Sequence, residues 1–302
     1  MTLSHSFAPV PSIPPPAVLV VTLGGQSQVV TLALDALLDQ GYAIGELIVV
    51  HLSEQNPRYQ AALAQLASAF ASGVYRNHPL RYRPYPVLLG GAPVSDIHSE
   101  ASTDAVLNTF HHLLQHLKQQ SISVHLCISG GRRMLGVLAL SAALIHFDYG
   151  DRIWHLYSTD AIRTQTHEGA ILHLPPGTPG VRLLPVPVRP WGYLFSALRV
   201  SPDADARAAM ASQDAALAAA EGARCQQVYD RLTPRRRDVL CAFADGLTPQ
   251  QVANKLSIEL STVSSHQTVI YQECQAAWNL PSTTKVDYRW VRDAFTRFFE
   301  RG

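Results

Sequence analysis

Apolar runs that alternate with amphipathic stretches place the strongest constraint on what this chain can fold into. Four runs are continuous, and a fifth is broken by Pro84 and Pro86. Strands that are apolar on both sides need helices on both faces of a parallel sheet. With right-handed crossovers, the pattern predicts a doubly wound, Rossmann-like α/β domain. The runs are 17–23, 46–52, 80–89, 123–129 and 152–158, and the helical patterns are 28–40, 57–73, 101–119 and 131–147.

The rest of the chain predicts further segments around this domain. Five prolines before residue 17 favour a stiff, unpacked tail at 1–16, with no signal-peptide pattern. Residues 17–200 form the α/β domain, which ends in a proline- and glycine-rich edge hairpin or wrapping loop at 168–200. Alanine-rich residues 201–231 predict a connecting helix, which is either a dimer contact or a solvated linker. Residues 232–302 predict an all-helical domain.

Composition excludes several classes of protein. The chain is 47% hydrophobic and 16% charged, which is typical of a packed globular protein. No stretch of about 20 apolar residues predicts a membrane span, and four widely spaced cysteines indicate neither a zinc site nor a disulfide framework. We therefore expect a cytoplasmic protein with no metal, no cofactor and no membrane partner. Residues 231–302 hold ten Lys and Arg against seven Asp and Glu, a small basic excess compatible with nucleic acid.

Two glycine-bearing loops follow the first and fourth predicted strands. In the common strand order 3-2-1-4-5-6 these strands are neighbours, and their carboxyl ends open the crevice where ligands bind. The two loops should therefore face one another across one cleft. The candidate ligand residues are Gly24, Gly25, Gln26, Ser27 and Gln28 in the first loop, and Ser129, Gly130, Gly131, Arg132 and Arg133 in the second.

The chemistry of both loops suits a phosphate or nucleotide ligand. Glycine lets the backbone approach a ligand closely, and both loops open helices whose free N–H groups favour anions. Arg132 and Arg133 can grip phosphate through paired hydrogen bonds. The simpler alternative is a tight turn at Gly24, a helix cap at Ser129 and solvated arginines. A P-loop and a G-x-G-x-x-G motif are both absent, and strand two ends in His51 rather than an acid, which argues against an ATPase or an NAD dehydrogenase.

Two segments resemble a known family. The sequences VLVVTLGGQSQVVTLAL at 18–34 and ISGGRRMLG at 128–136 are similar to the CARF domains of type III CRISPR accessory proteins, in the branch with an SGGRK-like fourth loop. The resemblance covers roughly residues 17–200. It implies a role in antiviral defence, a homodimer and binding of a cyclic oligoadenylate, usually cyclic tetra-adenylate. A two-fold dimer also suits a ring of identical nucleotides, because each protomer can grip half of it.

The resemblance leaves an enzymatic alternative open. Some CARF proteins are metal-independent ring nucleases, in which a first-loop serine and a fourth-loop lysine act on the phosphate. Ser27 would take the first role, displaced by one position if the loops align without a gap, and Arg133 replaces the lysine. Because arginine is a poor proton donor, any hydrolysis should be slow. A regulator that senses another nucleotide, outside CRISPR, is a third hypothesis.

The C-terminal pattern predicts three short helices. Thr233 and Thr248 are expected to cap the first two, each followed by proline, and Ser261 to cap the third; Gly246 should end the first. A tight turn between helices two and three is the helix-turn-helix arrangement. A further helix is expected at 281–302. A helical bundle that serves only dimerisation is the alternative.

Residues 232–275 carry Leu232-Thr233, Gly246-Leu247-Thr248 and Thr262-Val263 followed by His266. In these positions the segment resembles the LuxR/FixJ-type DNA-binding domain, which implies a third helix in the major groove of double-stranded DNA. Ser264 stands where that family usually has a lysine, so one expected contact is missing. Our first hypothesis is a ligand-gated transcription regulator, in which closure on the ligand shifts the connecting helices and the spacing of two recognition helices. The residues expected at DNA are Thr262, Ser264, Ser265, His266, Thr268 and Lys255, with Arg235 to Arg237 near phosphates.

Overall fold

The computed structural model describes residues 16–188, 205–281 and 283–300. Parts of four predicted segments lie outside the described residues: 1–15 of the tail, 189–200 of the loop, 201–204 of the connecting helix, and 282 and 301–302 of the last domain. The chain divides into two compact units, residues 1–210 and 211–302, and each is described by itself.

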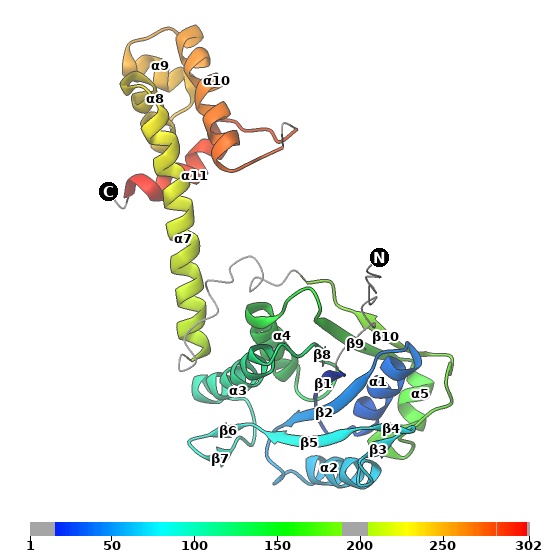
Figure 1. The fold of residues 1–302 in the computed structure, drawn as a ribbon. Coiled ribbons are helices and arrows are strands. Elements are labelled where there is room, and N and C mark those ends of the chain that lie inside the picture. Colours follow the sequence, from blue (N-terminus) through cyan, green and yellow to red (C-terminus); the bar gives the residue numbers. More distant parts are fainter. Residues whose placement is uncertain (1–15, 189–204, 282, 301–302) are drawn as a thin grey trace, which may run out of the picture. The chain divides into compact units, whose positions relative to one another are not determined.

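A six-stranded sheet forms the centre of the first unit (Figure 1). Its order is β10-β9-β8-β1-β2-β5. Read from β5, this is the predicted order 3-2-1-4-5-6, with β10 as the sixth strand at the edge. Strands β1, β2, β5, β8 and β9 are parallel to one another, and β10 pairs antiparallel with β9. The strands are β1 (Ala17–Thr22), β2 (Ile44–His51), β5 (Arg81–Pro86), β8 (Val124–Cys127), β9 (Arg152–Ser158) and β10 (Val181–Pro185).

Helices cover both faces of this sheet, as the continuous apolar strands require. Alternate residues of β1 enter two different cores: Val18 and Val20 pack with α3 and α4, whereas Leu19 and Val21 pack with α1 and α2. Figure 1 shows α3 and α4 on one side of the sheet and α1 on the other. The helices are α1 (Gln28–Asp39), α2 (Pro57–Ala69), α3 (Glu100–Gln119) and α4 (Arg133–His146).

The proline-bearing segments lie at the sheet's edges. Pro84 and Pro86 belong to β5, the terminal strand next to β2, where a missing N–H donor is tolerated. The predicted edge hairpin after residue 168 is present as β10, the terminal strand at the other side. Small elements complete the unit: β3 (Val74–Tyr75), β4 (His78–Pro79), β6 (Leu88–Leu89), β7 (Ala92–Pro93), α5 (Asp160–Gln165) and the 3-10 helix η1 (His167–Gly169).

The second unit is all helical. Helix α7 begins in the first unit and continues into the second, where Cys225 and Val228 join the core. Thr248 caps α9 through a reciprocal pair of hydrogen bonds with Gln251. Within the described part of the chain, no helix combines the length and apolar character needed to cross a membrane. The helices are α7 (Ala206–Arg231), α8 (Pro234–Ala244), α9 (Pro249–Leu256), α10 (Leu260–Ala277) and α11 (Tyr288–Glu300).

Two helix starts differ from the prediction. Helix α10 begins at Leu260 with Glu259 as its N-cap residue, so Ser261 is already inside the first turn. Glu259 has extended backbone angles, and its carbonyl accepts the amides of Thr262 and Val263, which fixes the start two residues early. Helix α11 begins at Tyr288 rather than near residue 281.

Candidate functional site

The two glycine loops lie in direct contact. We call residues 24–28 the β1 loop and residues 129–133 the β8 loop. A Cβ atom added to Gly24 would stand 2.9 Å from the Cα and N atoms of Gly131, so the two backbones touch. Gly131 has a φ of +79°, in the left-handed region that favours glycine. The predicted meeting of the loops at the carboxyl ends of β1 and β8 is therefore confirmed.

Thr22, the last residue of β1, ties the two loops together. Its hydroxyl accepts a hydrogen bond from the Gly130 amide at 3.2 Å and donates to the Cys127 carbonyl at 3.4 Å. A Cβ on Gly130 would come within 1.8 Å of the Thr22 carbonyl oxygen, so no larger residue fits there. The close contact of the glycines thus brings the two strand ends together. The polar side chains beside them are the groups that could contact a ligand.

Three arginines stand at this edge of the sheet. Arg132 pairs with Asp96 at 2.9 Å, and Arg58 pairs with Glu168 at 3.3 Å. The Arg132 and Arg58 side chains are 62% and 74% exposed, so these ion pairs are solvated and weak. Arg133 is also exposed and makes no hydrogen bond or ion pair with any residue that the structure describes. An incoming anion can therefore recruit these guanidinium groups at small cost.

Arg58 is the member of this group that sequence reasoning missed. It lies in the first turn of α2, and a Cβ on Gly25 would meet the Arg58 Cβ at 2.9 Å. The available signal was its position: Asn56-Pro57 opens the helix that follows strand two, at the same edge of the sheet as the glycine loops. The loop after strand two could therefore have been included with the loops after strands one and four as a candidate ligand-binding loop.

The polar residues of the β1 loop face a different partner. Residues 167–172, which we call the η1 strap, run over them. The Gln26 side-chain oxygen accepts from the Glu168 amide at 2.9 Å, and the Gln28 oxygen accepts from the Gly169 amide at 3.1 Å. Gln28 also donates to Gln26 at 2.6 Å. These amide side chains therefore hold the strap in place.

Ser27 is sealed beneath the η1 strap. The residue is fully buried, and its hydroxyl donates to the Gln65 side-chain oxygen at 2.5 Å. Gln65 in turn donates to the Glu168 carbonyl at 3.1 Å. A Cβ on Gly169 would lie 2.3 Å from the Ser27 Oγ, so the strap fits closely. In this arrangement the Ser27 hydroxyl cannot reach a substrate, and a catalytic role would require the strap to move.

Ser129 is held by the neighbouring strand rather than by a helix. Its hydroxyl accepts from the Leu156 amide at 2.6 Å and lies 3.1 Å from the His155 Nδ1. The N-cap residue of α4 is Arg132, so Ser129 does not cap that helix. The exposed His155 imidazole is a further polar group beside the β8 loop. Among the described residues, no group of three or more His, Cys, Asp or Glu side chains is arranged to hold a metal ion.

The second candidate site is the helix-turn-helix face of the second unit. Helices α9 and α10 are joined by a tight turn in which Ser257 is left-handed, with a φ of +53°. Val263 is buried in the core, which leaves the polar side of α10 outside. Of the six residues expected at DNA, four are exposed and two are half-buried. The exposed ones are Lys255, Ser264, Ser265 and Thr268, and the half-buried ones are Thr262 and His266.

Several basic groups around α10 have partners inside the unit. Lys255 pairs with Asp245 at 2.8 Å, with both side chains about half exposed. Arg235 donates to the Leu256 carbonyl at 2.7 Å, which ties α8 to the end of α9. Burial lowers the pKa of His266, and the nearby positive charges of the α8 arginines lower it further, so its imidazole is neutral at pH 7.

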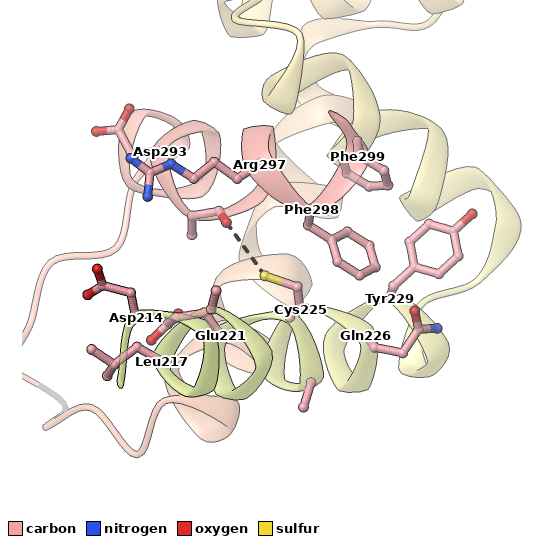
Figure 2. Close-up of a pocket in the computed structure, with 14 residues that line it drawn as sticks. Asp214, Leu217, Glu221, Cys225, Gln226, Tyr229, Asp293, Arg297, Phe298 and Phe299 are labelled. Atoms are coloured by element: carbon pink, nitrogen blue, oxygen red, sulfur yellow. Dashed lines mark hydrogen bonds between the residues drawn. The ribbon is translucent and has the colours of Figure 1, made fainter. Parts of the chain in front are cut away.

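A groove between α7 and α11 was not foreseen from the sequence. Figure 2 shows the side chains that line it, and its volume is about 1170 Å³. Small residues on α7, such as Ala218 and Gly222, leave room opposite the aromatic side chains of α11. At its floor the Cys225 thiol contacts the Ala294 carbonyl oxygen at 3.5 Å, and burial raises the pKa of that thiol to about 11. An unreactive thiol at the floor indicates a packing surface rather than a catalytic one.

Comparisons with known families agree with this two-part organisation. The model of the luxR family of bacterial regulatory proteins matches residues 230–277, which include α8, α9 and α10. No curated protein matches the chain. The model of the CRISPR-associated protein NE0113 family matches residues 26–215, most of the first unit. A CRISPR-associated domain and a luxR-type DNA-binding domain in one chain fit a CRISPR-linked regulator. The chain belongs to the CRISPR-associated protein NE0113 family.

Proposed function

We propose that the protein is a ligand-gated transcription regulator that senses a cyclic oligoadenylate, most simply cyclic tetra-adenylate, and binds double-stranded DNA. The observation that carries the proposal is the contact between Gly24 and Gly131 at the switch point of the sheet, with exposed arginines beside it. Ligands of doubly wound domains bind at that point. The two family matches supply the link to CRISPR and to DNA.

The ligand's phosphates would be held by side chains that face outward from the paired loops. Arg132 and Arg58 would exchange Asp96 and Glu168 for phosphate oxygens, and Arg133 would add a third cation. A phosphate accepts paired hydrogen bonds from a guanidinium at least as well as a carboxylate does. The start of α4 lies beside these groups and adds free N–H donors.

Gating requires a ligand that prefers one arrangement of the protein. A ligand with equal affinity for both arrangements would shift nothing. We infer a homodimer in which two copies of the site grip one cyclic ligand, because a two-fold axis matches a ring of identical nucleotides. Helix α7 is continuous between residues 206 and 231, so it can pass a change in the first unit to the DNA-binding helices.

The ring-nuclease alternative is less well supported. It needs Ser27 at the scissile phosphate, whereas the Ser27 hydroxyl donates to Gln65 under the η1 strap. The absence of a lysine at position 133 leaves arginine, which holds its proton too tightly to protonate a leaving group. Bound ligand should therefore be recovered intact over many hours.

Binding of labelled cyclic tetra-adenylate tests the sensor. The double variant R132A/R133A should lower affinity at least a hundredfold, because removal of each hydrogen bond between charged groups costs about 1.5–3 kcal/mol. R224A is the control: Arg224 is an exposed arginine that pairs with Glu221, which is about as exposed as Asp96, but it lies in the second unit. Unchanged affinity of R132A/R133A would refute the site, and a linear product would favour the nuclease.

A DNA-shift assay with and without the ligand tests the coupling. Cyclic tetra-adenylate should change the affinity of the full chain for duplex DNA by a factor of about 5–150, the usual range for two coupled sites. R132A/R133A should retain duplex binding and lose this response. Ligand binding without any change in DNA affinity would leave a sensor that is not gated as proposed.

A further inference from the structure

Helix α10, the helix expected at DNA, carries no lysine or arginine. Its 18 residues include one acidic side chain, Glu273, and the preceding N-cap residue, Glu259, is also acidic. Attraction to duplex DNA comes mainly from cations that neutralise phosphates. A helix of this composition cannot supply that attraction, so the cations must come from neighbouring elements.

The hydroxyl groups on the exposed side of α10 do not fill the gap. Ser264 donates to the Leu260 carbonyl, Ser265 to the Ser261 carbonyl and Thr268 to the Ser264 carbonyl, each at 3.1 Å. A hydroxyl has one proton to donate. With that proton used inside the helix, each oxygen presents only lone pairs outward, which suits the amino groups of bases but repels phosphate oxygens.

Two of the three consecutive arginines on α8 are occupied within the unit. Arg235 donates to the Leu256 carbonyl and pairs with Asp238. Arg237 donates to the Tyr229 carbonyl at 2.8 Å and lies over the Tyr229 ring, 4.5 Å from its centre, so it closes the end of α7. These two side chains hold helices together and are not free to move to DNA.

Arg236 lies between them and has no such task. It makes no hydrogen bond or ion pair with any residue in the described part of the chain, and its Nε is buried without an acceptor. It lies four and seven residues before Leu240 and Phe243, on the face of α8 that shares a core with α10. Its charge also helps to lower the pKa of His266, so its guanidinium lies near that half-buried residue of α10.

We propose that Arg236 is the principal phosphate-binding cation of this DNA-binding domain and replaces the charge that α10 lacks. The inference rests on the proposed DNA binding. A guanidinium with no acceptor inside the protein gains most from a phosphate oxygen, because no internal bond is lost when the new one forms. Lys255 is the weaker candidate, since it must first leave Asp245.

Fluorescence anisotropy of the full chain with a labelled 30-base-pair duplex of mixed sequence tests this inference. R236A should bind about tenfold more weakly at 50 mM salt than the wild-type protein, the equivalent of one charged hydrogen bond. Loss of one phosphate contact should also lower the slope of log affinity against log salt by about 0.9. The advantage of the wild type over R236A should therefore shrink about 3.5-fold between 50 and 200 mM salt.

Matched variants separate charge from fold. R236K keeps the charge and should keep the salt slope, and R236A/S264K, which returns a cation to exposed α10, should recover it. R224A removes an exposed arginine on α7 that pairs with Glu221, and it should bind like the wild type. Wild-type slope and affinity in R236A, or in R236Q if R236A does not fold, would overturn the inference. If the wild type binds no duplex, the proposed function fails as well.

Discussion

Substituting Gly131 by alanine measures how tightly the two loops are joined. The residue has a φ of +79°, and an added Cβ would lie 2.8 Å from the Leu23 carbonyl oxygen. Gly177 is the matched control, with a φ of +75° and nothing within 4 Å of an added Cβ. Both variants place an alanine in the left-handed region, which costs conformational free energy. Only in G131A must the Leu23 backbone also move to make room for the new Cβ.

The expected magnitudes follow from this comparison. A left-handed alanine costs roughly 1 kcal/mol, so G177A should lower the free energy of unfolding by about that amount. In G131A the Leu23 carbonyl must also retreat by roughly 0.6 Å to reach an ordinary contact distance of 3.4 Å. Overpacking of this kind costs about 1–3 kcal/mol. G131A should therefore lose about 2–4 kcal/mol in total.

Urea unfolding followed by circular dichroism gives these free energies, and hydrogen exchange of β1 and β8 assigns the transition to the first unit. The peptides that contain residues 17–23 and 124–128 should lose protection in G131A and keep it in G177A. Equal destabilisation of the two variants would show that Gly131 is needed only for its backbone angle. The contact between the loops would then not be a fixed part of the site.

Two further predictions concern buried charge in the first unit. Asp151 is buried and accepts from Lys118 and the Val124 amide, so D151N should lower the free energy of unfolding by about 3 kcal/mol; a loss below 1 kcal/mol in urea unfolding would contradict this. Burial lowers the pKa of His125 to about 4, and its Nδ1 accepts from Trp154. Because the unfolded imidazole takes up its proton near pH 6.5 and the native one only near pH 4, stability should fall by up to about 3 kcal/mol between those values. An NMR titration that gives His125 an ordinary pKa would refute the argument.

The sheet could be predicted because it depends on patterns within short segments. Apolar runs identify the strands, chain order and handedness limit their arrangement, and the meeting of the loops at Gly24 and Gly131 follows from that arrangement. Pro84 and Pro86 were expected to break the third strand, but β5 includes both without interruption, because an edge strand tolerates the missing N–H donors. Local sequence was therefore sufficient to predict a strand or helix wherever the apolar pattern of that element alone determines which side of it is buried.

The partners of polar side chains could not be predicted in the same way. Ser27 is covered by the η1 strap, which begins 140 positions later in the chain, and Arg58 meets Glu168 110 positions later. Neither contact leaves a periodic signal. The sequence also marks Arg235, Arg236 and Arg237 as equivalent, whereas helix packing gives two of them internal acceptors and leaves the third without one.

The glycine contact also narrows how a ligand can be held at the proposed site. The glycine pairs suggested a backbone open to close approach by a phosphate. In the structure, however, Gly24 and Gly131 approach each other, so the space beside them is already filled. The polar side chains of Ser27 and Gln28 already have hydrogen-bond partners: Ser27 donates to Gln65 beneath the η1 strap, and Gln28 accepts from the Gly169 amide of the strap. The groups that remain available are the guanidiniums outside the contact. A ligand held by them should bind with a strong salt dependence, because solvated ion pairs and phosphate contacts both weaken as ionic strength rises.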